Sequence, residues 1–200
     1  MNSKRIHIGK AFSYAWESVK NNFWYFVGLA LIVGVIESVG NIVYSGGKNS
    51  WGLLGILLSP WITAGYLYIL LSFYKSKKAP LDKVFVQGKY YLRALLATIW
   101  LMLIIGLGFV LFIIPGIYLA LKYQFVLNLI VDKNIGVSEA MKESARMTEG
   151  VKMRLFVFDL ACIGITIVGV LCFGVGLLVT MPIAWLAEIY IYKKLLTIEE

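Results

Sequence analysis

Six long runs of apolar residues follow one another along this 200-residue chain, separated by short polar segments. Their approximate bounds are 23–44, 51–74, 92–111, 113–131, 155–172 and 174–192. A helix crosses a bilayer with about 20 mainly apolar residues, and it satisfies its own backbone hydrogen bonds there. We therefore predict an all-α, polytopic membrane protein with six transmembrane helices.

The composition supports this class of protein. Apolar residues make up 60% of the chain and charged residues 15%, whereas soluble domains have about 45–50% and about 25%. The six runs use nearly the whole sequence. We therefore predict a single integral membrane domain over residues 1–200, without a separate soluble catalytic domain.

The spacing of the runs predicts three helical hairpins. The third and fourth runs are separated only near Pro115, and the fifth and sixth only by Phe173 and Gly174. Such short connections join helices that lie antiparallel and in contact. An alternative for either pair is one long run that forms a broken or re-entrant helix.

The basic residues predict the orientation. Seventeen of the 19 lie before the first run, between the second and third, between the fourth and fifth, or after the sixth. Lys48 lies on the other side, and Lys122 lies within a run. By the positive-inside rule both termini are cytoplasmic, in a prokaryotic cytoplasmic membrane. The net charge of +8 is thereby explained by topology and anionic lipid, so membrane lipids, and no nucleic acid, are the expected partners.

Short amphipathic stretches precede the hairpins, at about residues 8–20, 81–89 and 137–149. Their apolar residues recur at helical spacing and their charged residues take the opposite face. We predict three short cytoplasmic interfacial helices with their apolar faces toward the lipid.

A proline, a small residue and a tyrosine recur at the same offsets in the second helix of each predicted hairpin. They are Pro60, Pro115 and Pro182, then Gly65, Ala120 and Ala187 five residues later, then Tyr68, Tyr123 and Tyr190 eight residues after each proline. This pattern predicts internal repeats at 6–75, 81–132 and 137–194, with each proline at a helix start. Alternatively, prolines simply start helices and tyrosines anchor them without duplication.

Residues 114–125, which include Pro115-Gly116-Ile117, are followed by a Glu-Ala-x-x-x-Ser stretch at 139–144 and by Glu149-Gly150. The chain resembles an uncharacterised bacterial and archaeal six-span family, itself related in pattern to the membrane domain found beside glycerophosphoryl diester phosphodiesterase catalytic domains. The resemblance implies no enzyme activity, because phosphodiesterase activity belongs to a separate barrel domain.

Four ionisable residues within the runs are candidates for a polar site, because charge is costly inside a membrane. They are Lys122, Asp159, Glu188 and Glu37. Lys122 is expected at a depth similar to that of Glu188, where it can pair with Glu188 or with Asp159. The functional interpretation is a polar pathway or a lipid-headgroup site on the cytoplasmic half of the membrane, with Lys122 attracting an anion. The alternative is that Lys122 snorkels or pins helices together and the carboxylates reach headgroup water. Asn128, Ser144 and Thr148 are ordinary polar residues with no assigned role.

Catalytic and metal sites are not predicted. His7 is the only histidine, so a Ser-His-Asp triad or a two-histidine metal motif cannot form within the chain. Cys162 and Cys172 would lie about 15 Å apart on one helix, beyond disulfide reach. Gly106, Gly108, Gly174 and Gly176 lie in apolar runs, where they indicate close helix contacts rather than a phosphate loop.

These features predict a non-enzymatic integral membrane protein without a cofactor, acting through contacts with lipid or another membrane protein. The alternative is a small transporter or lipid-handling protein that uses the charged groups of the inner half of the membrane. An intramembrane enzyme is a third possibility, and the oligomeric state is open.

Overall fold

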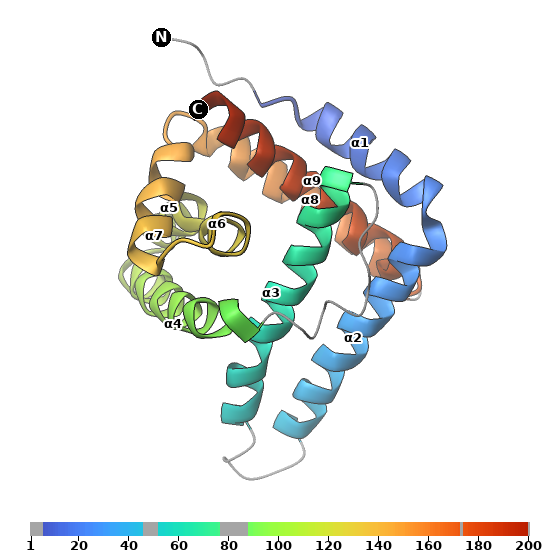
Figure 1. The fold of residues 1–200 in the computed structure, drawn as a ribbon, viewed down its shortest axis with the longest axis horizontal. Coiled ribbons are helices and arrows are strands. Elements are labelled where there is room, and N and C mark those ends of the chain that lie inside the picture. The colour runs from blue at the N-terminus through green and yellow to red at the C-terminus, as the bar shows by residue number, and fades with distance from the viewer. Residues whose placement is uncertain (1–5, 46–51, 77–87, 173, 200) are drawn as a thin grey trace.

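The computed structural model describes residues 6–45, 52–76, 88–172 and 174–199, and every regular element among them is a helix (Figure 1). The helices are α1 (Ile8–Asn21), α2 (Phe23–Ser45), α3 (Gly52–Ser76), α4 (Gly88–Leu111), α5 (Ile113–Tyr123), α6 (Val126–Lys133), α7 (Val137–Met147), α8 (Lys152–Leu171) and α9 (Leu177–Glu199). The predicted helical class is confirmed. The side chain of Glu37 and most of the predicted interfacial helix at 81–89 lie outside the described residues.

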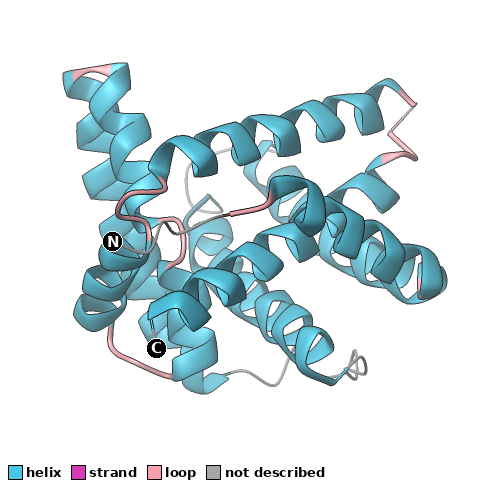
Figure 2. Cartoon of the chain, turned by 90° about the horizontal axis from the view of Figure 1, so that it is seen from above, coloured by secondary structure: helices cyan, strands magenta, loops and turns pink. Residues whose placement is uncertain are grey.

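Three segments of the described chain are long and apolar enough to cross a membrane. They are Tyr90–Leu111, Ile113–Lys133 and Lys152–Leu171. A fourth is added if α1 and the start of α2, which meet at an angle of 98°, are counted as one broken span. Seen from above, the helices run in several directions rather than as one parallel bundle (Figure 2).

The fourth apolar run contains an interruption, which was not predicted from the sequence. α5 ends at Tyr123 and α6 begins at Val126. Phe125, between them, has φ −95° and ψ 10° and therefore leaves the helical conformation. The break divides a 21-residue apolar segment into an 11-residue and an 8-residue helix.

Two glycines allow neighbouring helices to touch. A Cβ atom on Gly108 of α4 would lie 3.0 Å from the Gly116 Cα of α5, and one on Gly176 would lie 2.7 Å from the carbonyl oxygen of Gly169 in α8. Both distances are shorter than van der Waals contact, so these positions favour glycine. The predicted close contacts are confirmed at Gly108 and Gly176. Gly106 has open space at its Cα, and Gly174 has φ +74° in the turn before α9.

The apolar faces of the amphipathic helices α1 and α7 are covered by other helices of the protein. α1 lies along α9 (Figure 1), where Ala11 and Ala15 are fully buried and the Phe12 ring lies 5.5 Å from the Phe158 ring of α8. α7 packs on α6 through Ala140 and Met147. The prediction that these faces point to lipid is therefore wrong for α1 and α7. Helical spacing identifies an apolar face, but not whether lipid or protein covers it.

Two of the three prolines do not start helices. Pro115 is the third residue of α5, as predicted, but Pro60 lies inside α3 and Pro182 inside α9. The preceding apolar residues continue the helix on the N-terminal side of each. An interior proline removes one backbone hydrogen bond, and long apolar helices tolerate this loss when neighbouring helices pack around them.

Candidate functional site

The centre of the candidate site is the break between α5 and α6. A side chain of α7 hydrogen-bonds the backbone on both sides of this break. The hydroxyl of Ser144 donates a hydrogen bond to the carbonyl oxygen of Lys122 at 3.0 Å and accepts one from the N–H of Phe125 at 3.3 Å. Both backbone groups lost their helical partners at the break. A single buried side chain therefore satisfies both ends of the interruption, which would otherwise leave unpaired polar groups in an apolar core.

Thr148, at the end of α7, supports this arrangement. Its hydroxyl lies 2.9 Å from the carbonyl oxygen of Ser144, one turn earlier, and 3.3 Å from that of Lys122. One hydroxyl proton serves one acceptor at a time, so Ser144 is the principal donor to Lys122. Both hydroxyl residues are fully buried. The chain then turns away at Gly150, which has φ +79°, a conformation that favours glycine.

Lys122 faces a pocket between α4, α5 and α7. The pocket has a volume of about 590 Å³ and is lined by Trp100, Ile104, Lys122, Tyr123, Val137, Ser138, Met141, Lys142 and Ala145. No residue in this lining is acidic. Lys122 Nζ also lies 5.3 Å from the ring centroid of Tyr123. The lining of the pocket therefore combines the ammonium groups of Lys122 and Lys142 with an apolar wall.

Asp159 of α8 and Glu188 of α9 bind amide side chains from the broken segment. Gln124 donates to Asp159 at 2.9 Å, and Asn128 of α6 donates to Glu188 at 3.4 Å. The two carboxyl groups are close enough to interact electrostatically. The other amide atom of Gln124, its Oε1, is buried and has no hydrogen-bond partner among the described residues.

The predicted pairing of Lys122 with a carboxylate is not found. Within the described part of the chain, Lys122 forms no ion pair with Asp159 or Glu188. The reason is helical spacing, because residues two positions apart, such as Lys122 and Gln124, lie on opposite sides of a helix. Lys122 faces α7, whereas Gln124 faces α8.

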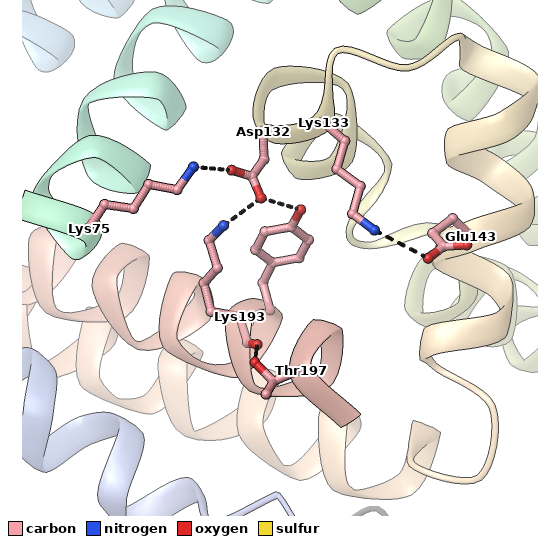
Figure 3. A network of polar contacts seen from close by, with 7 residues as sticks. Lys75, Asp132, Lys133, Glu143, Lys193 and Thr197 are labelled. Atoms are coloured by element: carbon pink, nitrogen blue, oxygen red, sulfur yellow. Dashed lines mark hydrogen bonds and ion pairs between the residues drawn. The ribbon is translucent and has the colours of Figure 1, made fainter. Parts of the chain in front are cut away.

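A second polar cluster joins the end of α6 to α3 and α9 (Figure 3). Asp132, whose side chain is 5% exposed, accepts hydrogen bonds from Lys75 of α3 at 3.1 Å, from Lys193 of α9, and from the hydroxyl of Tyr192 at 3.0 Å. We call these four residues the Asp132 junction. The Tyr192 ring is fully buried and lies 5.8 Å from the Phe125 ring, so the junction touches the break.

Two further contacts fix the turn between α6 and α7. Arg93 of α4 donates to the carbonyl oxygen and the side-chain oxygen of Asn134, at 2.6 and 2.9 Å. Asn134 ends α6 in a left-handed conformation, with φ 56°. Lys133 lies 3.7 Å from Glu143 (Figure 3). Glu143 also pairs with Arg146 at 3.0 Å. These contacts therefore fix the turn from which α7 returns to the break.

Sequence reasoning missed the residues that organise the site. Ser144, Thr148 and Asn128 are three of the four polar residues that are buried in the described part of the chain, and Asp132 anchors the junction. One signal was present: Ser144 and Thr148 lie four residues apart, in register with Ala140 on the apolar face of α7. A hydroxyl on an apolar helical face indicates a buried backbone partner.

The fold and these contacts define an all-helical protein with several helices of membrane-spanning length, linked by a buried polar core at a broken helix. Residues 53–199 match the family described as "Protein of unknown function (DUF975)", and the chain belongs to that family. The expected resemblance to an uncharacterised family is thus confirmed, while this match gives no link to glycerophosphoryl diester phosphodiesterases. No curated protein and no solved structure matches the chain.

Proposed function

We propose that this chain is a six-span protein of a prokaryotic cytoplasmic membrane, with both termini in the cytoplasm, and that it acts without catalysis through contacts with lipid or with another membrane protein. The same proposal includes the three internal repeats and a distant relationship to the membrane domain found beside phosphodiesterase catalytic domains. The charge distribution along the sequence supports the orientation.

One observation carries the proposal: large apolar side chains are exposed along the helices of spanning length. Val110 is 83% exposed, Ile114 80% and Leu171 75%, and all three lie near the turns that connect α4 to α5 and α8 to α9. Contiguous apolar surface of this kind needs a lipid or protein environment. The polar residues Asn128, Ser144 and Thr148 lie in the interior instead.

Extraction in a mild detergent tests this proposal. The full-length protein should carry phospholipid or a membrane-protein partner through purification, and native mass spectrometry should detect it. Deletion of the gene should sensitise the host cell to envelope stress such as osmotic shock or detergent. A protein that retains neither lipid nor partner, together with a deletion strain that behaves as wild type under stress, contradicts the proposal.

A small transporter is the second candidate, and the carboxyl pair favours it. Among the described residues, Asp159 and Glu188 each accept a hydrogen bond from an amide side chain and neither forms an ion pair, and their two carboxyl groups interact electrostatically. Paired carboxyl groups inside a membrane protein are typical of proton or cation pathways. Proteoliposomes with an imposed proton gradient test this candidate. Faster proton flux through wild type than through D159N/E188Q supports it, and equal flux in both contradicts it.

A further inference from the structure

Two lysines face a single pocket without a carboxylate in its lining. Lys122 comes from the end of α5 and Lys142 from the middle of α7, and the pocket between them measures about 590 Å³, within the range of about 300–1,000 Å³ typical of small-molecule sites. Neither lysine forms an ion pair with another described residue. Two uncompensated ammonium groups at one pocket create an electrostatic preference for an anion.

We propose that this pocket binds the phosphate-bearing headgroup of an anionic membrane lipid, with the phosphate between Lys122 and Lys142. The proposal rests on the membrane function proposed above and names the lipid class and its site. Ser138, on the first turn of α7, supplies a hydroxyl donor at the same pocket. The backbone N–H groups of that turn are also free of helical partners and favour a negative charge.

The wall of the pocket selects a lipid rather than free phosphate. Trp100, Ile104 and Met141 line it, and Trp100 is 54% exposed on α4. The same helix exposes Leu103 and Leu107 beside it, so the apolar wall continues along α4. A headgroup between the lysines therefore has its acyl chains along α4, where their burial is favourable. Inorganic phosphate gains nothing from this surface.

The site is also held in place before a ligand arrives. The carbonyl oxygen of Lys122 is bound by Ser144, and α7 carries Lys142 on its exposed side two residues before Ser144. The hydrogen bond that caps the helix break therefore fixes the spacing between the two lysines. Because the two backbones are already in place, less of the site has to be ordered when a ligand binds.

Native mass spectrometry of the purified full-length protein with an equimolar mixture of phosphatidylglycerol and phosphatidylcholine tests the proposal. Wild type should bind phosphatidylglycerol preferentially. K122Q/K142Q should lower that preference about thirtyfold, because each of the two lysines near the headgroup adds about 1 kcal/mol. K10Q/K20Q, which removes two exposed lysines of α1, should leave it unchanged, and K122R/K142R should retain most of it. Thermal unfolding of each variant should show that it is folded.

Three results would overturn the proposal. The first is an unchanged phosphatidylglycerol preference in folded K122Q/K142Q. The second is an equal loss in K10Q/K20Q, which would assign the preference to surface charge in general. The third is displacement of the bound lipid by millimolar inorganic phosphate, which would assign the site to the free anion. Equal retention of both lipids by wild type rejects this headgroup site alone. Retention of neither lipid nor partner, together with a deletion strain that behaves as wild type under envelope stress, rejects the proposed function as well.

Discussion

The Ser144 hydroxyl bridges the interrupted helix, because it donates to the carbonyl oxygen of Lys122 and accepts from the N–H of Phe125. These two backbone groups lie on either side of Tyr123 and Gln124. Ser144 itself comes from a different helix, 22 residues after Lys122. The geometry of the broken helix therefore depends on a side chain that is distant in sequence.

Replacing Ser144 with alanine should destabilise the protein. S144A leaves the N–H of Phe125 without its partner in a buried position, and an unpaired buried backbone group costs about 1–3 kcal/mol. Thr148 can still reach the carbonyl of Lys122, so the expected loss is in the lower half of this range. Unfolding by sodium dodecyl sulfate in mixed micelles measures it. S138A removes an exposed serine of the same helix and should change stability little; equal stability of S144A and S138A would contradict the role of Ser144.

The Asp132 junction should contribute strongly to stability. D132N removes the charge that Lys75 and Lys193 neutralise, and loss of one partner from a buried ion pair costs on the order of 3 kcal/mol. The two lysines should differ, because the Lys75 side chain is 61% exposed and that of Lys193 is 14% exposed. We expect K193M to be clearly destabilising and K75M to cost no more than about 1 kcal/mol. Equilibrium unfolding of the three variants checks this order, and a K75M effect as large as that of D132N would disprove it.

The contact between Gly176 and Gly169 should be sensitive to a single methyl group. In G176A the new Cβ would lie 2.7 Å from the carbonyl oxygen of Gly169, and backbone cannot move as freely as a side chain. Overpacking of this kind costs about 1–3 kcal/mol. Gly164 of α8 provides the control, since a Cβ there meets nothing within 4 Å. G164A should be neutral or stabilising, because alanine favours helix by about 1 kcal/mol. A thermal-unfolding midpoint that is lower in G164A than in G176A would count against this contact.

The six-span proposal predicts which side of the membrane carries Cys172. Both cysteines are free, and Cys172 is exposed just beyond the end of α8, at the predicted outer turn. In intact cells expressing the C162S variant, a membrane-impermeant maleimide should label Cys172. The matched control is K10C in a C162S/C172S background, placed on the exposed face of α1, which should be labelled only after lysis. Labelling of Cys172 only after lysis would rule out the proposed orientation.

The helices could be predicted from the sequence because they depend on local patterns of residues. Apolar runs of about 20 residues and glycines within them are visible without knowledge of the partners. The break within the fourth run was not predicted, because the alternative drawn from the sequence was a broken helix formed by two successive runs. No proline or glycine marks it, since Gln124 and Phe125 are ordinary helix residues. What favours the break is the hydroxyl of Ser144, and its contact with this segment is tertiary.

The candidate site was predicted only in part for the same reason. Ionisable residues in apolar runs identified Lys122, Asp159 and Glu188 as members of a polar region, but not which groups face each other. Lys122 and Gln124 are two residues apart and belong to different clusters, because residues at this spacing lie on opposite sides of a helix. Asp132 was overlooked because its position at the end of an apolar run resembles that of any loop residue. Its burial results from α3 and α9 closing over it.

The position of Ser144 after the broken segment has a consequence for biosynthesis. A chain made from its N-terminus exposes Lys122 and Phe125 to the insertion machinery before Ser144 has been translated. During that interval the carbonyl group of Lys122 and the N–H of Phe125 can hydrogen-bond only to water or to residues that have already been synthesised. Until α7 has been made, the segment 113–133 therefore lacks the side chain that hydrogen-bonds both sides of its interruption. The interruption becomes fully hydrogen-bonded only after α7 has been synthesised and has docked against α5 and α6.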